Sequence, residues 1–130
     1  MRQVFKTRTF ARWSRKAPVP DAVLCAAVTE MVAGLVDADL GGSVYKKRVA
    51  MPGRGKSGGA RVLIGTNRGT LWVFLFGFEK NERSTIDDRE LLGLQKTAAV
   101  FLAMNSSQLE RAVEAGELTE ICHEEKPNSK

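Results

Sequence analysis

The chain has 130 residues, 43% of them hydrophobic, and a formal net charge of +5, which fits one small domain with a single core and excludes two independent domains. Its longest apolar run, Leu71 to Phe78, is too short to cross a bilayer, and the N-terminus MRQVFKTRTF contains no apolar segment typical of a signal peptide. We therefore expect a soluble cytoplasmic protein in which Cys25 and Cys122 are reduced thiols.

The positive charge is concentrated in two segments. Residues 1–16 carry six basic side chains and no acidic one, and residues 43–83 carry nine basic side chains against two acidic ones. The segments 17–42 and 84–130 each sum to −4. A basic centre between acidic segments indicates a polyanion site, and nucleic acid is the commonest polyanion because neutralised phosphates release counterions. The alternative is an ordinary solvated basic surface.

The N-terminal part of the chain predicts a short strand and a helix. Residues 3–6 favour the strand, and residues 7–16 favour a helix with Phe10 and Trp13 on one face. A different face of this helix carries three arginines that are available to phosphate or solvent: Arg8, Arg12 and Arg15.

A second helix and a strand come next. The proline-containing segment 18–21 ends the first helix and starts another, in which apolar residues recur at intervals of three and four through residues 22–35. Residues 44–50 then alternate as a strand, with Lys47 on the face opposite to Lys46.

The centre of the chain predicts a loop followed by a hairpin. Residues 51–59, MPGRGKSGG, contain four glycines and a proline and predict a loop in which Arg54 and Lys56 are mobile. Residues 60–65 and 71–77 are rich in branched and aromatic side chains, and a short glycine-containing loop joins them. This pair of strands is expected to form the buried centre of an antiparallel sheet.

The last part of the chain predicts two helices, a strand and a tail. Ser84 or Thr85, with an aspartate three residues on, favours the start of the first helix, and Ser106 or Ser107 is the expected cap of the second. The expected bounds are residues 86–104 and 106–115 for the helices, 118–122 for the strand and 123–130 for a disordered tail.

The sequence motifs exclude a P-loop nucleotide site and a histidine-based metal or acid/base site. GRGKS lacks the first glycine of a phosphate-binding P-loop, because Ala50 occupies its position, and a strand rather than a helix follows. His123 is the single histidine and has no cysteine or carboxylate at metal-ligand spacing. We therefore expect no metal, no cofactor and no histidine-based acid/base pair.

A phosphodiester can still be cleaved without histidine when several cations stabilise the charge of the phosphorane. Basic residues on two neighbouring strands and just beyond the hairpin are spaced so that they can converge over one surface of the sheet. Some of them can equally be solvated surface charges. The candidate catalytic residues are Lys46, Arg48, Arg61, Lys80 and Arg83.

Three motifs, KKRVA, GRGKSGGAR and FGFEKNERS, together resemble the RelE/ParE superfamily of toxins from type II toxin–antitoxin modules, and most closely its HigB-like branch. The similarity covers most of the chain, to about Met104. It implies an α+β, RelE-like fold with two N-terminal helices packed on a twisted, mainly antiparallel sheet, followed by C-terminal helices. It also implies one toxin domain over residues 1–122.

The resemblance implies an activity as well. Toxins of the RelE and HigB branches enter the ribosomal A site and cut mRNA without a metal, through attack of a 2′-hydroxyl on the adjacent phosphate. Lys46, Arg48 and Arg61 match basic residues of the RelE pattern. Where that pattern has a second arginine and a tyrosine, this chain has Asn81 and Asp87.

The remaining roles follow from the same comparison. On this resemblance, we expect either Lys80 or Lys46 to act as general base, and Arg61 and Arg83 to stabilise the phosphorane. Asn81 orients a base or sugar. The other RNA-binding candidates are Arg54 and Lys56, and the side chains that either stack on a base or belong to the core are Phe76 and Phe78.

Two alternatives to an mRNA nuclease stay open, a gyrase poison and a nucleic-acid-binding module. The nuclease and the gyrase poison are both toxins, and a toxin of this kind implies an antitoxin partner. A ParE-like toxin would poison DNA gyrase without catalysis, and a third reading is a nucleic-acid-binding module without toxicity. The expected partner is a cognate antitoxin, often a helix-turn-helix protein of the HigA type, whose acidic residues complement Lys46, Arg48 and Lys56. The ribosome and mRNA are the other expected partners.

Overall fold

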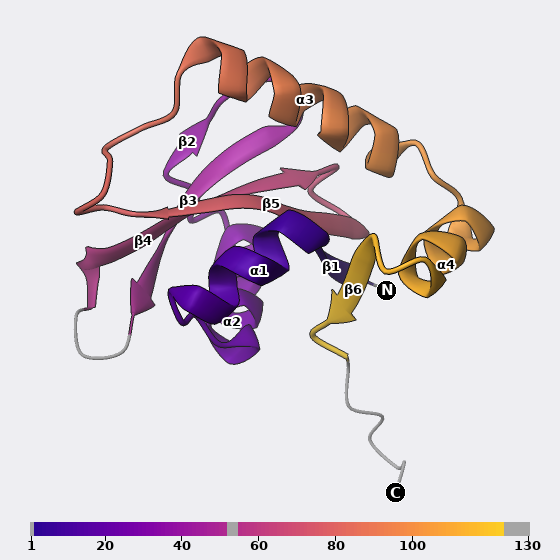
Figure 1. Cartoon of the computed structure of the whole chain (residues 1–130), viewed down its shortest axis with the longest axis horizontal. Coiled ribbons are helices and arrows are strands. Elements are labelled where there is room, and N and C mark those ends of the chain that lie inside the picture. Colours follow the sequence, from indigo (N-terminus) through magenta and orange to yellow (C-terminus); the bar gives the residue numbers. More distant parts are fainter. Residues whose placement is uncertain (1, 52–54, 124–130) are drawn as a thin grey trace, which may run out of the picture.

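The computed structural model of the chain describes residues 2–51 and 55–123 (Figure 1). None of the helices in these ranges is both long enough and apolar enough to cross a bilayer. The elements are, in chain order, β1 (Gln3–Thr7), α1 (Arg8–Lys16), α2 (Asp21–Val32), β2 (Ala38–Asp39), β3 (Val44–Met51), β4 (Gly55–Thr66), β5 (Leu71–Glu79), α3 (Asp88–Leu102), α4 (Ser106–Glu114) and β6 (Leu118–Ile121).

The six strands form one mixed sheet in the order β2-β3-β4-β5-β1-β6. Among the described residues, β1 and β5 form the one parallel pair, and the other four pairs are antiparallel. The expected α+β fold with a mainly antiparallel sheet is therefore confirmed, and β4 and β5 lie at its centre as predicted. The two-residue strand β2 was not predicted, because two residues are too few to show an alternating pattern.

Helices cover both faces of the sheet (Figure 1). Phe10 of α1 and Leu24 of α2 belong to one apolar cluster with Trp72 of β5. Ala98 of α3 and Leu109 of α4 belong to a second cluster on the opposite face. A strand that is buried on both faces reads as a continuous apolar run, which explains the sequence LWVFLFGF of β5.

The caps of α3 and α4 differ from the predicted ones. The cap of α3 is Asp87, whose side chain accepts a hydrogen bond from the backbone of Glu90, while the Glu90 side chain accepts one from the backbone of Asp87. The residue three positions after Ser84 or Thr85 is an aspartate. Its side chain is shorter than that of glutamate and does not form the return hydrogen bond to the cap backbone that a capping box requires. In α4 the same box forms between Asn105 and Gln108 instead of starting at Ser106 or Ser107.

The prediction of a glycine-rich loop over residues 51–59 was wrong for all of its described residues. Met51 is the last residue of β3, and β4 begins at Gly55. Pairing with β3 extends this far, from Met51↔Gly55 on, because a ladder of backbone hydrogen bonds outweighs the weak strand preference of glycine. Arg54, the side chain of Lys56 and residues 124–130 of the predicted tail lie outside the part of the chain that the structure describes.

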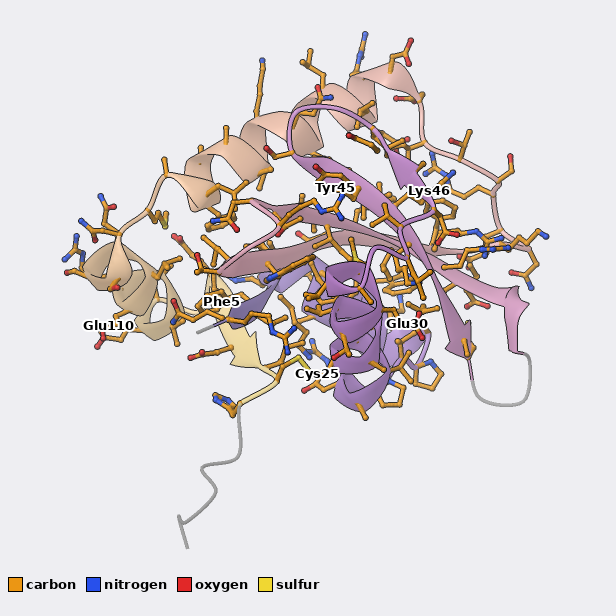
Figure 2. The ribbon with its side chains drawn as sticks, turned by 180° about the vertical axis from the view of Figure 1, so that it is seen from behind. Phe5, Cys25, Glu30, Tyr45, Lys46 and Glu110 are labelled. Atoms are coloured by element: carbon orange, nitrogen blue, oxygen red, sulfur yellow. A yellow bond between two sulfur atoms is a disulfide. The ribbon has the colours of Figure 1, made fainter. Side chains whose placement is uncertain are left out.

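The two cysteines form a disulfide, so the prediction of two reduced thiols was wrong. Cys25 lies on α2, Cys122 follows β6, and their Cα atoms are 5.5 Å apart, a usual distance for a disulfide. The two meet because Val28 of α2 and Ile121 of β6 pack into the same apolar cluster. Figure 2 shows Cys25 on the side of α2 that faces the C-terminal end of the chain.

Loss of this bond is expected to destabilise the fold, because the bond joins residues 97 positions apart. The chain-entropy model assigns about 4 to 5 kcal/mol to a closed loop of roughly 100 residues. The double variant Cys25→Ser/Cys122→Ser and the parent in a thiol reductant should both unfold at a lower urea concentration than the oxidised parent, as followed by circular dichroism. The reductant should leave the double variant unchanged, and equal midpoints for oxidised and reduced parent would contradict the expectation.

Candidate functional site

The pairing register of the central strands brings three of the predicted cations onto one face of the sheet. Lys46 is paired with Leu63, and Arg48 lies directly opposite Arg61. Directly paired residues point to the same side of a sheet, and Leu63 belongs to the apolar cluster on the face of α3 and α4. Lys46, Arg48 and Arg61 therefore share that face.

Aromatic side chains of β5 continue the same face. Arg61 is paired with Phe78, and the centroids of the Phe76 and Phe78 rings are 6.3 Å apart. The guanidinium of Arg83 lies over both rings, 5.9 Å from the centroid of Phe76 and 5.7 Å from that of Phe78, within the range of a cation–π interaction. The surface formed by the following four residues is hereafter the basic patch: Lys46, Arg48, Arg61 and Arg83.

Two members of the basic patch have carboxylate partners among the described residues, and the other two have none there. The Nε of Arg48 lies 3.0 Å from Oδ1 of Asp37, and Arg83 is paired with Glu90. Within residues 2–51 and 55–123, neither Lys46 nor Arg61 forms an ion pair. Like charges opposite each other on a sheet are destabilising, so the Arg48–Arg61 pair favours an external anion that both guanidiniums can bind.

Arg83 is held firmly in place. Its Nη1 donates to Oε2 of Glu90 at 3.1 Å, and its Nε donates to the carbonyl of Thr85 at 2.9 Å. The hydrogen bond to Glu90 raises the pKa of Arg83. The pKa of Glu90 is lowered, first by the hydrogen bond from Arg83 and then by the backbone N–H of Asp87. About a third of the Arg83 side chain remains exposed to solvent.

Glu90 also belongs to the capping box of α3. Its Oε1 accepts hydrogen bonds from both the backbone N–H of Asp87 and the guanidinium of Arg83. One carboxylate thus connects the first turn of α3 to the cation that lies over the end of β5. The Asp87–Glu90 spacing signals the cap in the sequence, but nothing in the sequence pairs Glu90 with Arg83 or Asp37 with Arg48.

Lys80 and Asn81 lie at the rim of the basic patch. Both are exposed in the turn that follows β5. The backbone N–H of Lys80 donates to the carbonyl of Gly59 at 3.2 Å, which holds this turn at the end of the sheet where Arg61 lies. Among the described residues, neither side chain forms a hydrogen bond or ion pair with the patch.

Lys47 and Tyr45 lie on the face of β3 opposite to Lys46, as predicted. Lys47 points away from the basic patch, and its Nζ lies 2.7 Å from a carboxylate oxygen of Glu30 on α2. Figure 2 shows Glu30 on α2, and Lys46 and Tyr45 on β3. Tyr45 shares the face of Lys47, because it is paired with Ile64 of the first apolar cluster. The single tyrosine is therefore not part of the patch.

Arg8 and His123 lie outside the basic patch. Arg8 is held at the end of α4, because its guanidinium donates to the carbonyls of Ala115 and Gly116. His123 lies beside the disulfide, in a hollow that Arg2 also lines. In the described ranges, no cluster of three or more histidine, cysteine, aspartate or glutamate residues is arranged to hold a metal ion.

Comparison with known proteins identifies a family to which the chain is similar. The family model described as the RelE toxin of the RelE/RelB toxin–antitoxin system matches residues 1–121. Searches of curated proteins and of solved structures found no match. The matched range includes every element of the sheet and every residue of the basic patch.

The ion pair between Arg83 and Glu90 should make stability depend on pH. Because the folded protein lowers the pKa of Glu90, the pair stabilises the fold fully above the ordinary glutamate pKa of about 4.3 and loses this effect as the pH falls through the lowered pKa. Glu90→Gln should therefore lower the urea midpoint more at pH 7 than at pH 3. A double-mutant cycle with Arg83→Gln isolates the pair. Equal effects at both pH values would contradict this origin.

Proposed function

Because this chain belongs to the RelE family of toxins from toxin–antitoxin systems, we propose that its basic patch cleaves messenger RNA on the ribosome. The main support is the directly opposed Arg48 and Arg61, with Lys46 on the same face. This arrangement is unfavourable for folding and suited to a phosphodiester. The motifs KKRVA and FGFEKNERS favour the HigB-like branch of the superfamily.

In the proposed reaction the RNA supplies its own nucleophile. The 2′-oxygen forms a bond to the adjacent phosphorus, the bond from phosphorus to the 5′-oxygen breaks, and the products are a 2′,3′-cyclic phosphate and a 5′-hydroxyl. Arg61 and Arg48 donate hydrogen bonds to the non-bridging oxygens, where negative charge develops in the phosphorane. Arg83, fixed by Glu90, adds a third positive charge.

We assign the role of general base to Lys46 rather than Lys80. Lys46 is partly buried on the same face as Arg61, whereas Lys80 is exposed in the turn. In its neutral form the Lys46 amine accepts the proton of the 2′-hydroxyl, and water protonates the leaving 5′-oxygen. Asn81 at the rim, together with Arg54 and Lys56, contributes to RNA binding in this proposal.

The family implies a cognate antitoxin as the partner of this chain. We propose that this antitoxin is a helix-turn-helix protein of the HigA type and that its acidic side chains compete with RNA for the basic patch. Lys46 and Arg61 are the natural contacts, since neither has a carboxylate partner within the described ranges.

A second candidate is a ParE-like gyrase poison. The observation in its favour is the composition of the patch, which contains neither histidine nor tyrosine, so that proton transfer depends on a lysine. A protein that only binds its target would not need such a group. This candidate predicts DNA damage signalling with intact mRNA after expression of the toxin.

Arg61→Ala tests the proposal. Removal of one donor to a developing oxyanion typically lowers the rate by about 100- to 1,000-fold. We expect a loss of this size in the cleavage of mRNA on programmed ribosomes, with growth arrest relieved in cells.

The matched control is Arg68→Ala. Arg68 is an exposed arginine of the β4–β5 hairpin loop, and its guanidinium lies 5.3 Å from the ring of Tyr45 at the other end of the sheet. This variant should cleave at the parental rate. Parental cleavage by Arg61→Ala, or growth arrest with intact mRNA, would overturn the proposed function.

A further inference from the structure

A hollow lies next to the basic patch, between α1 and the end of β5. Its volume is about 250 Å³, less than the roughly 300 to 1,000 Å³ of typical sites for drug-sized ligands, so it suits a single ring system. β1 pairs with β5 only as far as Phe74, which leaves this side of the last residues of β5 without a neighbouring strand in the described ranges. Four of its eight lining residues are aromatic: Phe10, Trp13, Phe76 and Phe78.

Trp13 is the aromatic side chain of the hollow best suited to stacking. A Cβ atom at Gly77 would lie only 2.3 Å from the indole ring, so the ring packs directly on the backbone of β5. Phe10 supports it from within the core, at 5.4 Å between ring centroids. Trp13 itself is only partly buried, whereas Phe10 and Phe78 are almost fully buried. The indole is thus fixed and partly accessible.

The polar residues of the hollow favour a base over a phosphate. Arg83 forms part of both the hollow and the basic patch, so the two sites adjoin. Glu82 also lines the hollow. Its carboxylate, which accepts a hydrogen bond from the backbone N–H of Glu79, would repel a phosphate but can accept a further hydrogen bond from an N–H group of a base. An aromatic hollow beside a cationic track is the usual arrangement for unpaired nucleotides.

We propose that this hollow is a nucleobase site that takes one unpaired base of the RNA whose backbone lies on the basic patch. The proposal rests on the proposed function and extends it: the base leaves the face of the sheet at Arg83, passes the edge of β5 and stacks on Trp13. Arg12 and Arg15, exposed on α1, supply positive charge for the neighbouring phosphates.

Tryptophan fluorescence provides a direct test. The chain has two tryptophans, and Trp72 is fully buried, so a stacked base quenches only Trp13. The probe is a six-nucleotide single strand with 2′-deoxy sugars, which lacks the attacking hydroxyl and is not cleaved. We expect it to quench the emission of the parent and of Trp72→Phe, and to bind Trp13→Leu about tenfold or more weakly.

Two controls separate stacking from charge and from packing. An oligonucleotide of the same length and charge with abasic sugars should not quench Trp13 and should bind the parent and Trp13→Leu equally. Trp13→Phe keeps an aromatic ring, so it should retain most of the affinity but lose the quenching, because the buried Trp72 is its only remaining tryptophan. Quenching that persists in Trp13→Phe would overturn the proposal even if Trp13→Leu does not fold.

The outcomes distinguish this proposal from the proposed function. Absence of binding, binding without quenching, or equal binding of the abasic strand would overturn the nucleobase site, while loss of ribosomal cleavage in Arg61→Ala would still support the nuclease. Conversely, Trp13 could be quenched by the base-containing strand but not by the abasic strand, while Arg61→Ala cleaves mRNA at the parental rate. That result would support the nucleobase site and rule out the proposed nuclease activity.

Discussion

The register of β3 against β4 is the constraint on which the site depends. Side chains on a strand alternate between the two faces, so a slip by one residue would exchange every side chain of β3 between them. The native register buries Val44 and Val49 on opposite faces and joins Lys47 to Glu30 beneath α2. A slipped register would bring Lys46 and Arg48 beneath α2 and so bury two cations. The apolar core thus selects the arrangement in which the cations meet.

The end of β5 and the start of α3 form one electrostatic unit. Glu90 closes the cap of α3 and neutralises part of the charge on Arg83, while the guanidinium covers the rings of Phe76 and Phe78. The helix also approaches the sheet closely, since a Cβ atom at Gly65 would lie 2.8 Å from that of Ala98. Helix α3, which covers the core, therefore also fixes Arg83 beside Lys46 and Arg61, which have no carboxylate partner among the residues that the structure describes.

Local patterns predicted most of the fold and the location of the patch. Alternation in VYKKRVA assigned Lys46 and Lys47 to opposite faces, and the apolar run of β5 indicated a central strand. The patterns failed where contacts between distant segments decide the structure. The pairing of Arg48 with Asp37, the strand pairing of a glycine-rich segment and the Cys25–Cys122 bond all depend on packing between elements, which leaves no periodic signal in the sequence.

The position of the disulfide has a consequence for cleavage of the chain itself. The bond joins residue 25 to residue 122, so all of β3, β4, β5, α3 and α4 lie within the covalent ring that it closes. A protease that cuts any single peptide bond inside this ring opens it without producing two separate molecules. The nicked protein keeps its mass, apart from one added water, until a thiol reduces it, and only then can the two fragments diffuse apart.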